Sequence, residues 1–332
     1  VTLAARISDI NARIKTDPGG DHAGKSIRIL GLKSAFHGRT DRPARFSDST
    51  REVYCKNLAS FRDFDNLLTV EPNNIQQLEQ VYSYADNNNL FIEAFFLEPV
   101  MGEGSPGLSV TTEFYVRARE LTREHGTLFL VDSIQAGLRG HGVLSICDYP
   151  GFENIDAPDM ETYSKALNGG QYPLSVLALS KETAALYRAG VYGNTMSTNP
   201  RALDIAVSVL NSLTPEMRQN IQDRGRELKE KLIDLQSELD GDITRVQGTG
   251  LLLSAELDPQ RFKSYGANST EEYMRIHGIN VIHGGKNALR YTPPFDITSE
   301  EVDLIIAATR EAIVNGPVKK TSDQSGETSE AA

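Results

Sequence analysis

The sequence predicts an α/β protein with a large domain on a mostly parallel sheet, followed by a small α+β domain. Apolar runs at 26–32, 91–97 and 128–132 are typical of buried strands. Helical patterns separate the later runs, which is the order that parallel strands joined by crossover helices require. Beyond residue 203 the pattern changes to amphipathic helices and short strands.

Composition and charge narrow the class of protein. The chain has 332 residues with 39% hydrophobic content, enough for a large core and about two domains. Its formal net charge of −11 argues against nucleic-acid binding, and no apolar run approaches the ~20 residues that span a membrane. The two cysteines, Cys55 and Cys147, lie far apart and no apolar leader precedes the fold, so we expect a cytoplasmic protein without a disulfide.

A helical pattern is present from the first residues. Its apolar positions are Leu3, Ile7, Ile10 and Ile14. Apart from Thr2 no capping residue precedes this pattern. We therefore expect that upstream sequence is missing.

The next elements lead to a first carboxylate at a strand end. The run 26–32 predicts a strand, whereas 41–74 is rich in charge and turn residues and is predicted to be irregular surface. A helix at 75–85 and a strand at 91–97 follow, and Glu98 stands directly after that strand. Ligands of α/β sheets bind at the carboxyl ends of strands, which makes this loop a candidate site.

A second carboxylate and a lysine follow in the same way. Thr111 or Thr112 caps a helix that Gly126 ends, and the strand 128–132 stops on Asp132. Further along, Lys165 stands at the edge of a turn of small residues. A carboxylate for a pyridine nitrogen and a lysine that forms a Schiff base are the groups that pyridoxal 5′-phosphate (PLP) requires.

The C-terminal part alternates helices with short strands. Asn199 and Pro200 form a helix start, and Thr298 with Glu301 forms a capping box for the last helix. Helices are predicted at 202–213, 215–239 and 270–277, and strands at 244–246, 251–257, 280–283 and 288–292. We predict a large domain at 1–203, a small domain at 204–316 and a disordered tail at 317–332.

Several segments together resemble the class III aminotransferases. They are AFHGRT at 35–40, EPVMGEG at 98–104, VDSIQAG at 131–137, SKALNGG at 164–170 and GNTMSTNP at 193–200. Several motifs in the family's order are more specific than one short motif. The resemblance implies the PLP fold type I architecture and action mostly on ω-amino groups.

The resemblance implies a set of cofactor-binding residues. Phe36 would stack on the PLP ring, with His37 beside it in the same segment, and Ile134 would pack on the opposite face. Gln135 would hydrogen-bond the ring hydroxyl oxygen. Thr195 would reach the cofactor phosphate of a neighbouring subunit, which implies a homodimer with shared active sites.

It also implies a substrate site and shows two departures. Arg39 would hold a substrate carboxylate, for which its planar donor set is suited. Glu103 would pair with Arg290 for one substrate and swing away for the other; alternatively, the two never meet. The family's Ser-Gly-Thr/Ser turn for the cofactor phosphate is not found, and Ser133 stands where most members carry glutamate.

From these features we predict a PLP-dependent transaminase. Through a Schiff base at Lys165 it would move an amino group from an ω-amino acid or similar amine to a keto acid, with 2-oxoglutarate expected. The alternatives are an aminomutase or a decarboxylating transaminase of the same fold, or a catalytically silent scaffold. The first two would differ in their products, and the last would not bind PLP.

Overall fold

The strands form two separate sheets in the computed structural model, which describes residues 1–62 and 64–319. Within these residues the first sheet has six strands in the order β2-β1-β3-β4-β5-β6. All neighbours are parallel except the β5 and β6 pair, so the prediction of a mostly parallel sheet is confirmed. The strands are β1 Ser26–Leu32, β2 Leu67–Val70, β3 Leu90–Leu97, β4 Leu128–Asp132, β5 Met160–Tyr163 and β6 Val176–Leu179.

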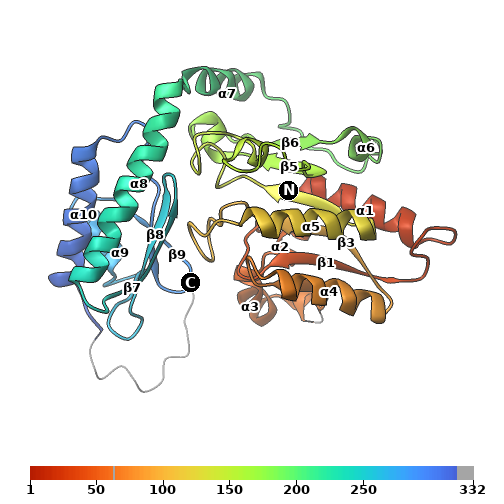
Figure 1. The fold of residues 1–332 in the computed structure, drawn as a ribbon, viewed down its shortest axis with the longest axis horizontal. Coiled ribbons are helices and arrows are strands. Elements are labelled where there is room, and N and C mark those ends of the chain that lie inside the picture. Colours follow the sequence, from red (N-terminus) through yellow and green to blue (C-terminus); the bar gives the residue numbers. More distant parts are fainter. Residues whose placement is uncertain (63, 320–332) are drawn as a thin grey trace.

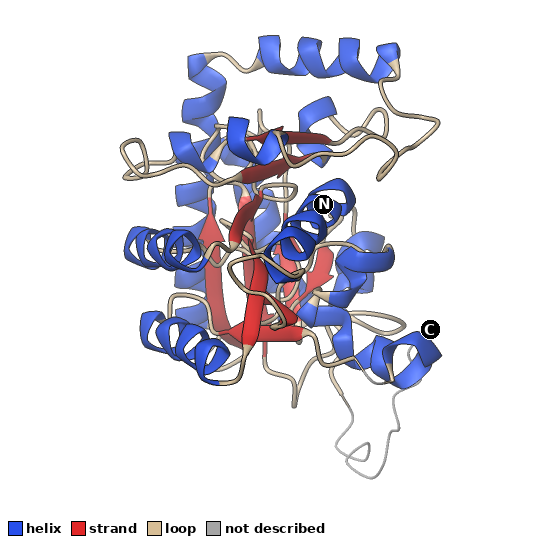
Figure 2. Ribbon diagram, turned by 90° about the vertical axis from the view of Figure 1, so that its right-hand side faces the viewer, coloured by secondary structure: helices blue, strands red, loops and turns tan. Residues whose placement is uncertain are grey.

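Helices cover both faces of this sheet (Figure 2). Phe95 packs with helices α4 and α5 on one face, whereas its neighbour Phe96 packs with α1 on the other. Since successive strand residues point to opposite faces, burial of both faces explains why the strand sequences are continuously apolar. The helices around the sheet are α1 Thr2–Thr16, α2 Asp41–Arg45, α3 Asp48–Asn57, η1 Ala59–Phe61, α4 Ile75–Asn87, α5 Thr112–His125, η2 Ile146–Asp148, η3 Lys165–Asn168 and α6 Lys181–Ala184.

The segment 41–74 is more regular than its sequence predicts, so that prediction is wrong. It contains α2, α3, η1 and the strand β2. Helix α3 buries none of its residues and therefore has no apolar stripe for a sequence pattern to reveal. Strand β2 has four residues at the edge of the sheet and is defined by its pairing with β1.

The second sheet has four antiparallel strands in the order β7-β8-β10-β9. Helices α8 and α10 pack on it, beside the first sheet (Figure 1). Helix α7 spans the predicted domain boundary at 203/204, and Asn199 caps it as expected. The elements are α7 Pro200–Ser212, α8 Pro215–Glu238, β7 Ile243–Thr249, β8 Leu252–Leu257, α9 Thr270–Ile276, β9 Ile282–Gly284, β10 Ala288–Tyr291 and α10 Ser299–Val314.

Four remaining sequence predictions have different outcomes. The capping box of Thr298 and Glu301 is confirmed at the start of α10, and both cysteines are free. None of the described helices combines the length and the apolar character needed to cross a membrane. Most of the predicted disordered tail, residues 320–332, lies outside the described residues.

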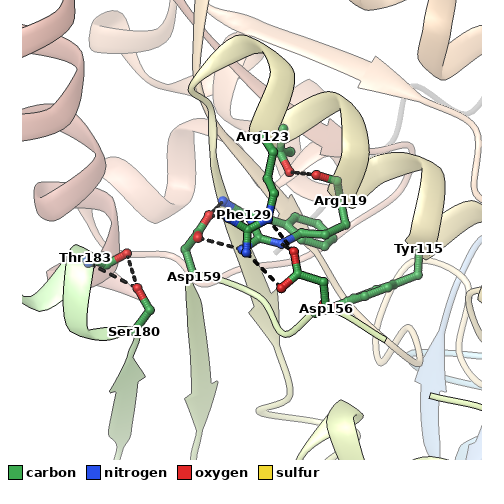
Figure 3. Close-up of polar contacts among 9 residues, drawn as sticks. Tyr115, Arg119, Arg123, Phe129, Asp156, Asp159, Ser180 and Thr183 are labelled. Atoms are coloured by element: carbon green, nitrogen blue, oxygen red, sulfur yellow. Dashed lines mark hydrogen bonds and ion pairs between the residues drawn. The ribbon is translucent and has the colours of Figure 1, made fainter. Parts of the chain in front are cut away.

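A buried ion cluster fixes the start of β5 against its neighbours (Figure 3). Arg119 of α5 donates two hydrogen bonds of 2.9 Å to the carboxylate of Asp159. The same carboxylate accepts the N–H of Phe129 in β4 at 2.7 Å, and the carbonyl of Asp159 accepts the N–H of Ser180 at 2.9 Å. Asp159 thus ties α5, β4 and the segment after β6 to the strand that leads to Lys165.

We expect Asp159→Ala to lower the free energy of unfolding by about 3 kcal/mol, because it removes the carboxylate that accepts two hydrogen bonds from a buried arginine and leaves only the exposed Asp156 as its partner. The side chain of Arg119 is only 6% exposed. Asp156→Ala is the matched control, since Asp156 pairs with the same arginine but is 48% exposed, and we expect less than about 1 kcal/mol. Urea denaturation measures both, and equal losses would contradict this assignment.

Candidate cofactor and substrate site

Asp132, at the end of β4, is a buried carboxylate with several hydrogen-bond donors around it. It is 4% exposed, and its carboxylate accepts hydrogen bonds from His37 Nδ1 at 2.8 Å and from Thr162 Oγ1 at 3.0 Å. Burial acts to raise the pKa of Asp132, but the hydrogen bond and charge of His37 outweigh it and the pKa is lowered. Asp132 is therefore ionised at neutral pH.

Lys165 follows the last residue of β5, the neighbour of β4, by two positions and begins the short helix η3. Its backbone has φ +48°, a left-handed conformation that costs energy for a residue other than glycine. Burial lowers the pKa of Lys165, and the positive charge of Arg290 lowers it further, while Asp132 opposes the shift. A lysine with a lowered pKa provides a neutral amine more readily, as a covalent anchor requires.

The loop after β3 connects several parts of the site. Glu98 is buried and accepts the N–H of Phe36 at 2.8 Å and the N–H of Gly102 at 2.9 Å. Burial raises the pKa of Glu98 to about 7. Gly102 lies against Gln135 so closely that a Cβ added there would meet the Gln135 side chain at 2.2 Å. This loop therefore brings Phe36 and Gln135 to one place.

Glu103 and Arg290 meet although 187 residues separate them. Arg290 Nη1 lies 3.3 Å from Glu103 Oε2, and it also donates to the carbonyl of Gly102. Both charges act on the pKa of Lys165, which places the pair within electrostatic reach of the lysine. Glu103 and Arg290 are therefore in contact, contrary to the alternative interpretation that the two residues never meet.

Three other predicted residues are connected less directly with Asp132 and Lys165. Ile134 follows Asp132 by two residues, and its N–H donates to the Asp132 carboxylate at 3.3 Å. Arg39 is exposed, with its guanidinium carbon 5.4 Å from the centre of the Phe36 ring. Thr195 lies exposed in the loop before α7, and the described contacts do not bring it to Asp132 or Lys165.

Sequence reasoning did not assign a role to Thr162 or to the side chain of Glu98. Thr162 carries no motif signal, because its importance comes from pairing beside Asp132 in the sheet.

This donor set fits PLP. Asp132 is a buried, ionised acceptor for a protonated ring nitrogen, and Lys165 is an amine with a lowered pKa within its electrostatic reach. Phe36 is a half-buried aromatic ring at the same strand ends.

Comparison with known proteins identifies the family. The profile of the class-III aminotransferases matches residues 12–313. The chain is 29% identical over 289 residues to ornithine aminotransferase 1 of Staphylococcus saprophyticus, covering 87% of this chain and 67% of that protein. It is 30% identical over 286 residues to ornithine aminotransferase 2 of Staphylococcus aureus, with coverages of 85% and 65%. The chain thus spans about two thirds of the length of these relatives.

Solved structures agree on the fold. An ornithine aminotransferase from Toxoplasma gondii, described with partial occupancy of PLP at its active site, superposes with a TM-score of 0.77 at 25% identity, over 95% of this chain and 70% of that one. An N-acetylornithine aminotransferase from Stenotrophomonas maltophilia gives 0.69 at 24% identity, over 95% and 71%. The predicted fold type I architecture is thereby confirmed. The chain belongs to the class-III aminotransferases, a family of PLP-dependent transferases.

Proposed function

We propose that this protein transfers an amino group from an ω-amino acid, such as ornithine or acetylornithine, to a keto acid, with 2-oxoglutarate as the expected acceptor. The observation that carries this proposal is geometric: Lys165 follows β5, which pairs with β4 beside Asp132, and Glu103 and Arg290 lie in contact at 3.3 Å. Chemistry at an amine and recognition of a carboxylate would then occur side by side. The relatives named ornithine and acetylornithine aminotransferase support the substrate class.

When bound, PLP supplies an electron sink that stabilises negative charge on the carbon bearing the amino group. Lys165 Nζ would be its covalent anchor, displaced by the incoming amine and then free to take the proton from that carbon. Asp132 would hold a proton on the ring nitrogen by ion pairing. Phe36 and Ile134 would enclose the ring, and Gln135 would donate to its hydroxyl oxygen.

Two arginines would recognise substrate carboxylates. Arg290 is paired with Glu103 in the structure, an arrangement that hides its charge from a donor with an amine at that end. Movement of Glu103 would free Arg290 for a carboxylate of the keto acid. Arg39, exposed beside Phe36, would bind the other carboxylate through its planar donors.

We further propose a homodimer with shared sites. The segment from β6 to α7 carries a band of large apolar side chains that are exposed on the single chain: Val176, Tyr187, Met196, Leu203, Val207 and Leu210. The last three have helical spacing along α7 and so share one face. Such a band is typical of a protein interface. Thr195 lies within it, where it could extend into a partner's cofactor site.

The two free cysteines are half-buried, and they support a cytoplasmic location because unpaired thiols persist in reducing compartments. We therefore include a cytoplasmic location in the proposed function.

The direct test supplies the protein with PLP, a panel of ω-amino acids and 2-oxoglutarate, and measures glutamate formation by mass spectrometry with a ¹⁵N-labelled donor. We expect the label in glutamate. Release of carbon dioxide would instead indicate a decarboxylating enzyme, and label moved within the donor would indicate a mutase. Failure to bind PLP would favour the silent scaffold.

We expect Glu103→Gln to lower kcat/KM for the ω-amino donor by about tenfold, while the half-reaction with the keto acid is largely kept. The physical reason is that glutamine cannot neutralise Arg290, so the positive charge repels the donor amine. Glu113→Gln, an exposed glutamate in the first turn of α5, is the control and should change neither constant. An equal loss in both half-reactions would exclude a role for Glu103 in exchanging substrates.

A further inference from the structure

Glu161 is a buried carboxylate on β5, four residues before Lys165. It is 4% exposed, and it accepts hydrogen bonds from Ser133 Oγ at 2.6 Å, Ser145 Oγ at 2.7 Å and the N–H of Ile146 at 3.0 Å. Ser133 is the residue that departs from the family pattern, and here it has a defined partner. One side chain thus contacts two segments that lie twelve residues apart in sequence.

Glu161 lies on the sheet face opposite the contact between Thr162 and Asp132. In the register of β4 and β5, Asp132 stands beside Thr162 and Val131 beside Glu161. Successive side chains of a strand point to opposite faces, so the carboxylate of Glu161 points away from Asp132. It therefore acts on the site through the segments that it binds.

Those segments are the two ends of one connection, residues 133–146, which we call the bridging segment. It leaves β4 at Ser133, continues through Ile134 and Gln135, and returns at Ser145 and Ile146. Both of its ends are hydrogen-bonded to Glu161. The cofactor residues predicted in this segment follow directly after the first of these bonds.

The middle of the bridging segment binds the region of the second sheet. Arg139 Nη1 donates to the carbonyl of Pro293 at 2.7 Å, and the carbonyl of Arg139 accepts the N–H of Leu251 at 3.0 Å. Gln222 of α8 donates to the carbonyl of His141 at 3.0 Å. The ends of the segment are therefore held by β5 while its middle is held by the other sheet.

A carboxylate at this position is costly. Burial raises the pKa of Glu161, although the hydrogen bonds of Ser133 and Ser145 oppose the shift. The neighbouring strand positions are occupied by apolar side chains such as Met160 and Val131, so an apolar residue would be accommodated here. An apolar residue could not accept the three hydrogen bonds that the carboxylate accepts.

We propose that Glu161 is a positioning residue for the proposed transamination: it fastens both ends of the bridging segment and so holds Ile134 and Gln135 in place for the cofactor. This inference rests on the proposed function. Glu161 lies outside all the motif segments, and its role would be to order the part of the site that Ile134 and Gln135 form.

The test compares Glu161→Val with Glu161→Gln in the intact protein. Hydrogen exchange of residues 133–146 is measured without added PLP, and PLP affinity is measured by absorbance titration. We expect Glu161→Val to raise exchange in this segment and to weaken PLP binding, each on the order of tenfold, the effect typical of losing a residue that orients a ligand group. Glutamine can accept from Ser133 and Ile146 and donate to Ser145 Oγ, so Glu161→Gln should stay within about threefold of the wild type.

Two further variants keep the test decisive. Ser133→Ala removes one bond, leaves the carboxylate in place, and should give a smaller change in the same direction even if Glu161→Val does not fold. Glu93→Val replaces another buried strand glutamate, on β3, and should cause no selective increase in exchange at 133–146.

Unchanged exchange and PLP affinity in Glu161→Val and Ser133→Ala would overturn the proposal. Equal damage in Glu161→Gln and Glu161→Val would also overturn it, because the hydrogen bonds would then not be the cause. A wild-type protein that binds PLP but transfers no amino group would refute the proposed function alone, since the exchange and affinity measurements do not depend on turnover.

Discussion

Replacement of Lys165 by alanine is expected to lower transaminase turnover by roughly 10³-fold or more, because it removes the covalent anchor and the proton-transferring amine together. Proton transfer by a positioned group alone typically contributes about 10²–10⁴-fold. The amine has a lowered pKa and lies within electrostatic reach of Asp132. Steady-state assays with 2-oxoglutarate measure the loss, and the absorbance of covalently held PLP should disappear with it.

Lys181→Ala is the matched control for this experiment. Lys181 is an exposed lysine in the first turn of α6, after the strand that pairs with β5. Its replacement should leave both turnover and the absorbance band unchanged. A Lys165→Ala protein that kept the band and its turnover would refute the assignment of this lysine.

Asp132→Asn is expected to reduce kcat by about 10²–10³-fold, the range observed when one preorganised electrostatic group is removed from an active site. Asparagine has nearly the same size and its oxygen can still accept from Thr162 and Ile134, whereas its NH2 group cannot accept the hydrogen bond of His37. It carries no charge and therefore cannot keep a proton on the ring nitrogen. Kinetics, together with thermal unfolding to verify that the fold is kept, test this expectation.

Asp148→Asn serves as the control, because Asp148 is an exposed aspartate in η2. Its activity should equal that of the wild type. Full activity in Asp132→Asn would show that the ion pair with the cofactor ring is unnecessary, and it would remove one half of the proposed catalytic pair.

Local sequence signals determined much of the fold. The apolar run before Asp132 predicts β4, and the caps at Thr111, Asn199 and Thr298 are each confirmed at the start of a helix. These features depend on residues within one or two turns of each other, so the necessary information is contiguous. The motif segments likewise predicted Glu103 and Arg290 as partners, and the two lie in contact.

Other features were decided only by tertiary structure. Strand β2 within 41–74 is defined by its pairing with β1, and the antiparallel direction of β6 is defined by its pairing with β5. The bonds of Glu98 to Phe36 and of Glu161 to Ser133 join residues 62 and 28 positions apart. The sequence by itself determined which residue types end the strands and cap the helices, because periodicity and capping are local. The folded chain alone decided which buried polar groups meet, because such groups must find partners wherever packing places them.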